Sequence, residues 1–102
     1  MKEKLLEIIN NYGVMPQLKY FQSEIFELNE AIMEYEHDEY NYYEPVEENH
    51  KSHIAEEIAD VMVMLKQFQY HYKIRDEHIE VIMEQKIDRQ LERIANEKKE
   101  RR

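Results

Sequence analysis

The sequence predicts an all-α fold of about four helices, and two observations carry this prediction. The 102-residue chain has one glycine, two prolines and no cysteine, and it is rich in the helix formers Glu, Lys, Leu, Ile and Met. Apolar residues recur at steps of three and four in separate segments, as they do on one face of a helix. We expect residues 1–102 to form a single helical domain with so small a core that oligomerisation would add useful buried surface.

The expected helix ends are marked by residues that stop or start a helix. Gly13 should end the first helix, because glycine readily takes the positive φ found just after a helix. Pro16 suits the start of the next helix, and Asp76 is a suitable N-cap for the last one. The four expected helices are Lys2–Asn11, Gln17–Glu36, Asn49 or Ser52 to Tyr72 or Lys73, and Asp76 to Asn96 or beyond.

Each of the three longer helices has an apolar stripe that we interpret as its core face. Side chains that repeat every three or four residues share one side of a helix, and an apolar side is normally buried. The third helix also carries Ala59, Met62 and Val63 outside its stripe, so we expect it to contact another subunit. The expected core residues are Leu18, Phe21, Ile25, Leu28, Ile32 and Tyr35 in the second helix, Ile54, Ile58, Val61, Leu65, Phe68 and Tyr72 in the third, and Ile79, Met83, Ile87 and Ile94 in the fourth.

Helical periodicity is lost between residues 37 and 51. This segment is acidic and rich in tyrosine, and Pro45 interrupts it, so we expect a loop that is long for a small bundle. Tyr40, Tyr42 and Tyr43 would be suited to stack on a nucleotide base as a lid, although a loosely packed loop explains the same residues. The basic residues at 97–102 are expected to form a frayed, solvated end.

Two pairs of carboxylates lie beside the expected core. Glu24 and Glu27 are three residues apart in the second helix, and Glu57 and Asp60 are three apart in the third, so each pair projects from one face. A single pair of this kind is usually a solvated flank of an acidic helix. Two pairs facing each other would repel unless a cation lay between them. The sequence therefore predicts a divalent metal held by these four side chains.

The net charge of −9 is concentrated around these carboxylates. Residues 24–60 hold thirteen Asp and Glu against a single lysine, Lys51. Proteins that bind duplex nucleic acid need a continuous basic surface, so this distribution argues against that class. No segment has the roughly 20 apolar residues that cross a bilayer, and the N-terminus lacks the features of a signal peptide. With no cysteine, the chain is expected to work in the reducing cytoplasm without membrane contact.

A basic stripe follows in the last helix. Lys86, Arg89 and Arg93 are spaced by three and four residues and border its expected core face. Pairing with Glu92 and its neighbours within the helix would explain the stripe without any ligand. With a metal on the other helices, the same stripe would bind phosphate oxygens. A small phosphate ligand is therefore compatible with this acidic chain.

Together these residues resemble the MazG-like branch of the all-α nucleoside triphosphate pyrophosphohydrolases. The signature of that family is ExxE followed by ExxD, which is read here as Glu24-Ile25-Phe26-Glu27 and Glu57-Ile58-Ala59-Asp60. Gln17, the run EEIADVMVML and Lys86-Ile87-Asp88-Arg89 extend the similarity over most of the chain. Ser23 departs from the pattern, because many members carry another acid at that position.

The resemblance implies an enzyme that hydrolyses a nucleoside triphosphate to the monophosphate and pyrophosphate, as in the removal of non-standard nucleotides. It implies Mg²⁺, or Mn²⁺ in its place, and a homodimer or homotetramer of helical bundles. One carboxylate would act as general base, and which one is left open. The implied site consists of Glu24, Glu27, Glu57 and Asp60 as metal ligands and catalytic carboxylates, Lys86, Arg89 and Arg93 as phosphate-binding residues, and Gln17 and Tyr20 as candidate substrate contacts.

Two other classes of protein remain open. A non-catalytic helical bundle would bind a nucleotide or a protein partner without turnover. A ferritin-like di-iron protein would use Glu-x-x-His pairs, which occur here as Glu34 with His37 and Glu47 with His50. Both pairs fall in or beside the expected loop, where helical geometry would be lost, and this argues against iron.

Overall fold

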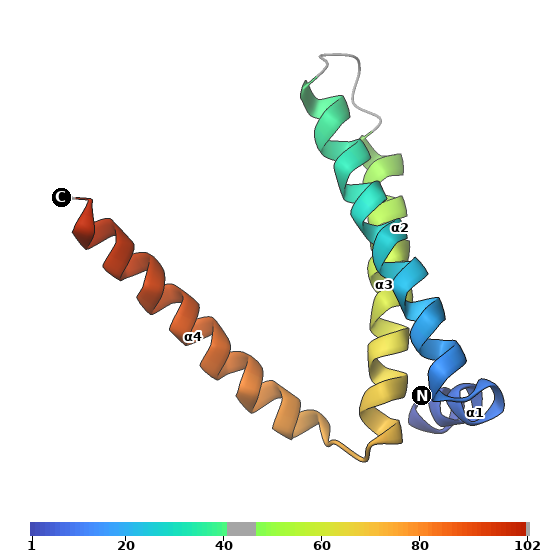
Figure 1. Cartoon of the computed structure of the whole chain (residues 1–102). Coiled ribbons are helices and arrows are strands. Elements are labelled where there is room, and N and C mark those ends of the chain that lie inside the picture. Colours follow the sequence, from blue (N-terminus) through green and yellow to red (C-terminus); the bar gives the residue numbers. More distant parts are fainter. Residues whose placement is uncertain (41–46, 102) are drawn as a thin grey trace. The chain divides into compact units, whose positions relative to one another are not determined.

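The computed structural model describes residues 1–40 and 47–101, with side chains described for residues 1–37 and 50–101. These residues form four α-helices and no strand, which confirms the all-α prediction. No described helix has an apolar stretch long enough to cross a membrane. The chain divides into two compact units, Met1–Tyr72 and Lys73–Arg102. The helices are α1 (Lys2–Tyr12), α2 (Val14–Tyr40), α3 (Glu47–His71) and α4 (Asp76–Glu100) (Figure 1).

The turn from α1 to α2 follows the prediction from sequence. Gly13 ends α1 with a φ of 91°, and its N–H donates a hydrogen bond of 2.8 Å to the carbonyl of Ile9. Residues with a Cβ rarely adopt this φ, which explains why the single glycine of the chain stands here. Because α2 begins at Val14, Pro16 lies in its first turn, where a missing N–H costs no hydrogen bond within the helix.

The segment expected to be a long loop is mostly helical. Residues 37–40 extend α2, and residues 47–51 begin α3. The predicted loop of residues 37–51 is therefore wrong in its extent, because solvated acidic residues can continue a helix without any apolar periodicity. Of the three tyrosines considered as a lid, Tyr40 belongs to α2, and Tyr42 and Tyr43 lie outside the described residues.

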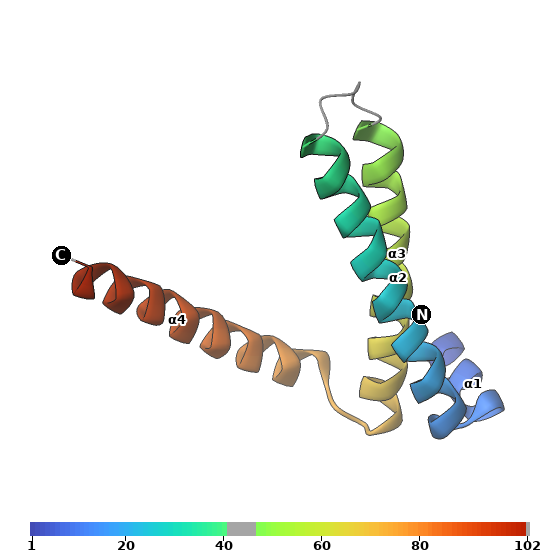
Figure 2. The ribbon, with the colours of Figure 1, turned by 45° about the horizontal axis from the view of Figure 1, so that its top comes forward.

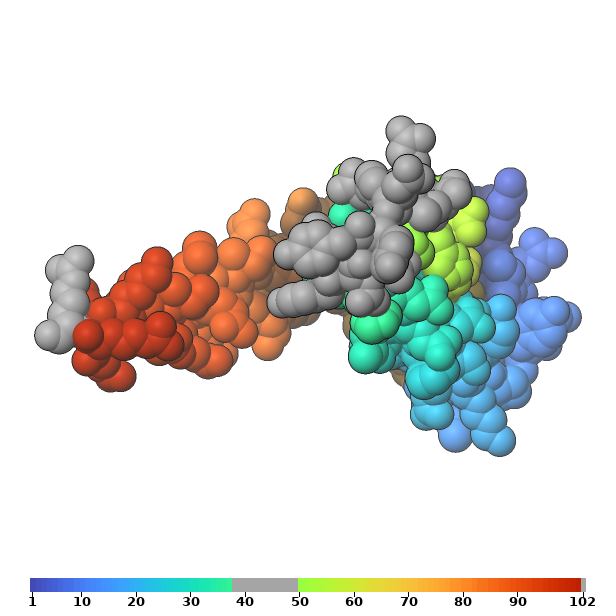
Figure 3. Space-filling model, turned by 90° about the horizontal axis from the view of Figure 1, so that it is seen from above, coloured from blue at the N-terminus to red at the C-terminus, as the bar shows by residue number. Residues whose placement is uncertain are grey.

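The first unit is built on α2 and α3, which run antiparallel and side by side (Figures 1 and 2). α1 packs against both helices at the end where α2 begins and α3 finishes, and it buries Leu5 and Ile9 there. The Lys2 ammonium lies 5.4 Å from the centre of the Tyr70 ring in α3, a cation–π contact between the same elements. The space-filling view shows the atoms of α1 and α2 adjoining one another (Figure 3).

The centre of the α2–α3 pair is largely polar. Eight of the described side chains are buried, and half of them are polar. The buried positions of α2 are seven residues apart, at 17, 24 and 31, and those of α3, at 57, 64 and 67, are separated by seven and three residues. Both spacings keep the side chains on one side of a helix, along the line where α2 meets α3. We call this line the polar seam, and its polar members are Gln17, Glu24, Glu57 and Gln67.

The stripes predicted as the core of α2 and α3 are not buried as expected, because they lie beside the polar seam. Leu18 and Ile25 in α2 are 39% and 46% exposed, and Leu65 in α3 is 50% exposed. Two packed helices bury only the line along which they meet, and here polar residues occupy that line. Among the remaining stripe residues, Ile32, Ile58 and Tyr72 are exposed, and Phe21, Leu28, Tyr35, Ile54, Val61 and Phe68 are half-buried.

Both apolar stripes lie on the same side of the α2–α3 pair. Each residue advances a helix by about 100°. Ile25 is therefore rotated by about 100° from the buried Glu24, and Ile58 by the same angle from the buried Glu57. In antiparallel helices, equal rotations away from the contact line lead to the same side. Phe21 and Phe68 meet across this side with ring centroids 5.6 Å apart. We call its exposed residues the apolar face: Leu18, Ile25, Ile32, Ile58 and Leu65, each 39–50% exposed.

A hydrogen bond between two buried glutamines joins α2 to α3. Nε2 of Gln17 donates to Oε1 of Gln67 over 2.7 Å. The Nε2 atoms of both amides also contact the sulfur of Met64, at 4.0 Å and 3.7 Å. Gln67 is 1% exposed and Gln17 8% exposed, so water does not compete for this bond. The pair therefore sets the register of the two helices.

The second unit is the single helix α4, and none of its residues is fully buried. Ile79 is half-buried, and Met83, Ile87 and Ile94 are 45–55% exposed. These residues were predicted to be buried in the core, and within this unit they are not buried. A single helix has no neighbouring element against which its apolar side can pack.

The ends of α4 differ slightly from the prediction. Arg75 is the N-cap, with its carbonyl accepting the N–H of Ile79, so Asp76 lies in the first turn and is not the cap. The negative charge of Asp76 still favours this end, because helix N-termini are electropositive. The helix continues to Glu100, which confirms an end beyond Asn96 and shows that residues 97–100 are helical and not frayed.

Gln67→Ala is expected to lower the free energy of unfolding by about 1–3 kcal/mol, because it leaves the buried amide of Gln17 without its acceptor. Gln22→Ala, at an exposed position of α2, is the control and should change this free energy by less than about 0.5 kcal/mol. Urea unfolding followed by circular dichroism, at one protein concentration, measures both. Equal unfolding midpoints for the two variants would contradict a stabilising role for the glutamine pair.

Candidate metal centre

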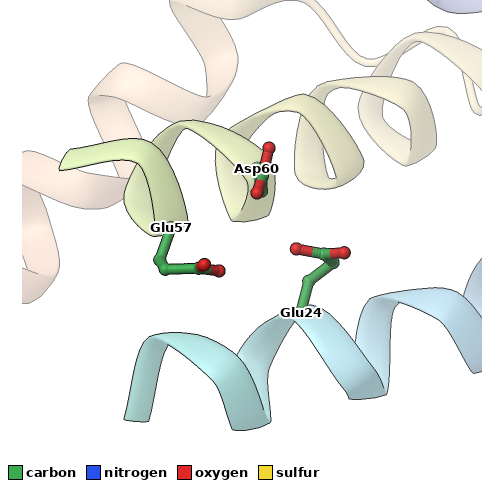
Figure 4. Close-up of side chains that lie close together, drawn as sticks. All are labelled: Glu24, Glu57 and Asp60. Carbon is green, nitrogen blue, oxygen red and sulfur yellow. The ribbon is translucent and has the colours of Figure 1, made fainter. Parts of the chain in front are cut away.

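Three carboxylates meet where α2 crosses α3. Glu24 from α2 and Glu57 and Asp60 from α3 each place one oxygen within 4.8 Å of the others. Figure 4 shows the three carboxylates facing one another across the space between the helices. Carboxylate oxygens are the ligands that hard divalent cations prefer. Among the described side chains, this is the group of acidic and histidine residues that could hold a metal.

The register of the helices explains why these carboxylates converge. Glu24 lies seven residues after Gln17, and Asp60 lies seven residues before Gln67. Because the two glutamines are bonded and the helices are antiparallel, about two turns along each helix lead from this bond to opposing positions. Glu57 is three residues from Asp60 and shares its face of α3. The glutamine pair and the carboxylate cluster are thus successive layers of one seam.

The two glutamates of the cluster are buried without full hydrogen bonding. Glu24 is 4% exposed and Glu57 is 8% exposed, whereas Asp60 is exposed. Oε2 of Glu24 and Oε2 of Glu57 are buried and have no hydrogen-bond partner. Leaving a carboxylate oxygen unpaired in the interior is costly, and a cation is one partner that would satisfy both oxygens at once.

Tyr20 and Glu24 lie one turn apart on α2, and each shifts the pKa of the other. Hydrogen bonding with the Glu24 carboxylate, followed by the negative charge of that carboxylate, raises the pKa of Tyr20. Burial raises the pKa of Glu24, and this effect outweighs the hydrogen bond from Tyr20, which acts in the opposite direction. Glu24 therefore holds a proton more readily than an exposed glutamate does.

Glu57 is the second carboxyl group of the cluster with a raised pKa. Burial is the main cause, and the negative charges of Glu27 and Asp60 act in the same direction. The charge of His53, one turn earlier on α3, opposes this shift in pKa. We assigned no role to His53 from the sequence, although its position four residues before Glu57 already placed it on the same face.

Glu27 is the predicted ligand that does not join the cluster. It is exposed on α2, and its carboxylate is not among the three oxygens that lie within 4.8 Å of one another. Its charge nevertheless raises the pKa of both Glu24 and Glu57, so it lies near them. The structure therefore brings three of the four predicted carboxylates together and leaves the fourth at the edge.

The other residues predicted for the site lie in different settings. Gln17 is buried in the polar seam with its amide bonded to Gln67, whereas Tyr20 is 56% exposed beside the cluster. Lys86, Arg89 and Arg93 are exposed on α4, in the second unit. A shallow groove of about 330 Å³ on this one helix is lined by Arg89, Glu92, Arg93, Asn96, Glu97 and Glu100.

The two Glu-x-x-His pairs are helical, contrary to the expectation. Glu34 and His37 lie within α2, and Glu47 and His50 lie in the first turn of α3. The reason given against a di-iron site, loss of helical geometry, is therefore wrong. Among the side chains that the structure describes, however, neither His37 nor His50 belongs to the metal-capable group.

Comparison of the chain with protein-family models, with curated proteins and with solved structures finds no match. The chemistry of the three carboxylates therefore has to be inferred from their own geometry.

The raised pKa of Glu57 predicts how the metal-free protein responds to pH. A carboxyl group whose pKa is higher in the folded state binds protons preferentially there, so its contribution to stability falls as pH rises from the ordinary pKa through the raised one. Glu57→Gln has no carboxyl group at this position, so it does not lose this stability as the pH rises. We expect it to raise the thermal unfolding midpoint near pH 7 in EDTA, and to have no such effect at about pH 3, where the carboxyl is protonated in both states.

Glu56→Gln is the matched control, because Glu56 is the exposed neighbour of Glu57. Its unfolding midpoint should equal that of the wild-type protein at both pH values. A Glu57→Gln variant that is less stable than wild type near pH 7 would contradict the destabilising effect of the buried charge.

Proposed function

We propose that this protein is a Mg²⁺-dependent nucleoside triphosphate pyrophosphohydrolase of the MazG-like type. The observation that carries the proposal is the pair of buried oxygens, Oε2 of Glu24 and Oε2 of Glu57, that lack hydrogen-bond partners beside Asp60. The same three residues belong to the ExxE and ExxD motifs on which the family resemblance rests. Geometry and motif thus support one assignment independently.

A hard divalent cation is the ligand that fits this cluster. The three ligand groups are all carboxylates, and the chain contains no cysteine. Zn²⁺ favours cysteine and histidine, whereas Mg²⁺ and Mn²⁺ favour oxygen. Mg²⁺ also keeps several waters and commonly shares its coordination with phosphates, so a few carboxylates are sufficient.

The proposed reaction breaks the bond between the α-phosphorus and the oxygen that bridges to the β-phosphate. A water oxygen attacks the α-phosphorus, and the bridging oxygen leaves with the bonding electrons as part of pyrophosphate. When bound, Mg²⁺ would neutralise the negative charge of the phosphates and polarise the phosphoryl group. Glu27, which is exposed and outside the ligand group, has the free carboxylate that is needed to accept the proton of the water.

The phosphates of the substrate also need cationic partners from the protein. Lys86, Arg89 and Arg93 are exposed and spaced by three and four residues, so they share one side of α4. Guanidinium groups bind phosphate oxygens in a bidentate manner, and lysine binds them as a point charge. We propose that this stripe, taken by itself, is a binding surface for phosphate oxygens.

Glu57→Gln is expected to reduce nucleoside triphosphate hydrolysis by roughly 100-fold or more, because it removes a charged ligand from the cluster. Glu30→Gln, at an exposed position of α2, is the control and should keep wild-type activity. The assay measures phosphate released after added inorganic pyrophosphatase, over a panel of ordinary and modified triphosphates with Mg²⁺ or Mn²⁺.

Other outcomes would identify the competing classes. A wild-type protein that binds Mn²⁺ and nucleotide but cleaves no triphosphate would be a non-catalytic binding bundle. Tight iron binding with a visible absorption band, and no triphosphatase activity, would indicate a di-iron protein. Either result overturns the proposed hydrolase.

We propose further that the active form is a homo-oligomer joined through the apolar face. Its five members are 39–50% exposed, and exposed apolar surface on this scale usually marks an interface. Met62 and Val63, which we expected at a subunit contact, are also 54% and 43% exposed. A second copy would bury the side chains that the α2–α3 pair leaves uncovered, in a dimer or a tetramer.

Leu65→Glu is expected to dissociate the oligomer, because it places a charge within the apolar face. Asn11→Glu adds the same charge to an exposed polar position of α1 and should leave the assembly intact. Size-exclusion chromatography with light scattering measures the mass of each variant. A wild-type protein that is monomeric at micromolar concentration would contradict the proposed assembly.

A further inference from the structure

α4 has an apolar stripe that the described residues of its own unit leave uncovered. The second unit is this one helix, and none of its described residues is buried. The stripe recurs at steps of four and three along about 22 Å of the helix, so a partner that covers it has to be equally long and narrow, as another helix is. Its members are Ile79, Met83, Ile87, Leu91 and Ile94, of which the last four are 45–59% exposed.

The charges of α4 are divided between its two halves. Residues 76–85 hold four Asp and Glu and no Lys or Arg, whereas residues 86–101 hold six Lys and Arg against four acids. A second α4 that runs in the opposite direction would place the acidic half of each helix along the basic half of the other. A parallel pair would place the two acidic halves together, where they repel. The charges therefore favour an antiparallel partner with the same sequence.

The apolar stripe of α4 suits the same arrangement, because it is nearly symmetrical about Ile87. Met83 and Leu91 each lie four residues from Ile87. Ile79 and Ile94 lie eight and seven residues from it. In an antiparallel pair with a twofold axis at Ile87, Met83 of each helix would meet Leu91 of the other. One contact would then cover both stripes.

This arrangement also brings the basic stripes of the two helices together. Lys86 immediately precedes Ile87, so it is rotated from the apolar stripe by about 100°. Arg93 precedes Ile94 and is rotated in the same direction, and Arg89 lies between the two cations on their side of the helix. Equal rotations in antiparallel helices lead to the same side, so the cations of both copies would repel one another there unless an anion lay among them. A polyphosphate has the charge and the oxygen acceptors that lysine and arginine bind.

We propose that α4 pairs in antiparallel orientation with α4 of a second copy around a bound polyphosphate, such as pyrophosphate or a triphosphate group. This interface is separate from the apolar face of α2 and α3. The phosphate part of the inference rests on the proposed function, which assigns phosphate binding to the basic stripe. The pairing itself rests on the charges and the apolar residues of α4.

Leu65→Glu isolates this interface, because it is expected to be monomeric when polyphosphate is absent. Size-exclusion chromatography with light scattering measures the mass of the full-length variant in EDTA, with and without millimolar pyrophosphate. We expect pyrophosphate to double the mass, and to double that of the wild-type protein as well. Sodium chloride at the same ionic strength is the control for charge screening and should leave the variant monomeric.

Two matched pairs of substitutions in the Leu65→Glu background test the two parts of the interface. Ile87→Asn should abolish the doubling, whereas Val81→Asn, at a similarly exposed apolar position off the stripe, should preserve it. Lys86→Gln should raise the pyrophosphate concentration needed for pairing by about 10-fold, because it removes a charged donor. Lys99→Gln, at an exposed position away from the basic stripe, should leave this concentration unchanged.

Three results would overturn the inference. The Leu65→Glu variant and the wild-type protein could both keep their mass in pyrophosphate, pairing could be equally strong without pyrophosphate, or pairing could survive Ile87→Asn. None of these results depends on hydrolysis. The proposed function fails in the activity assay with Mg²⁺, whereas this inference fails in the mass measured without metal.

Discussion

The hydrogen bond between Gln17 and Gln67 is the interaction on which the first unit depends. It is 2.7 Å long and buried, so sliding α3 along α2 would leave two amides unpaired, at about 1–3 kcal/mol for each. This penalty holds the helices in the one register that sets Glu24 opposite Asp60. The geometry of the candidate metal centre is therefore a consequence of a bond that lies about two helical turns away from it.

A polar seam carries an energetic cost that the rest of the unit has to offset. Two buried carboxylates with unpaired oxygens hold α2 and α3 together less firmly than aliphatic side chains would. α1 contributes buried apolar surface through Leu5 and Ile9, but only at one end of the pair. A protein whose central charges are ligands is stabilised by the cation that it binds. On the proposed function, folding stability and metal binding are thus coupled through Glu24 and Glu57.

The two sides of the α2–α3 pair differ in chemistry, and this places the proposed subunit contact and the proposed substrate binding on opposite sides. The apolar face lies on one side of the seam. Tyr20 and Glu27 in α2 and His53 in α3 are rotated to the opposite side, by the same helical geometry. A second copy would then cover the apolar side while a charged substrate approaches the carboxylates from the other. Neither process would obstruct the other.

Local sequence was sufficient for the helical class, for the end of α1 at Gly13 and for the pairing of Glu57 with Asp60, because composition, φ preference and three-residue spacing act within one helix. It was not sufficient to tell which of two neighbouring stripes faces inward. The sequence favoured burial of the apolar stripe, yet the polar stripe is the one that is buried. The difference depends on the hydrogen bond between Gln17 and Gln67, which is fifty positions away in the chain. The exclusion of Glu27 from the cluster likewise depends on distances between α2 and α3, which no local pattern contains.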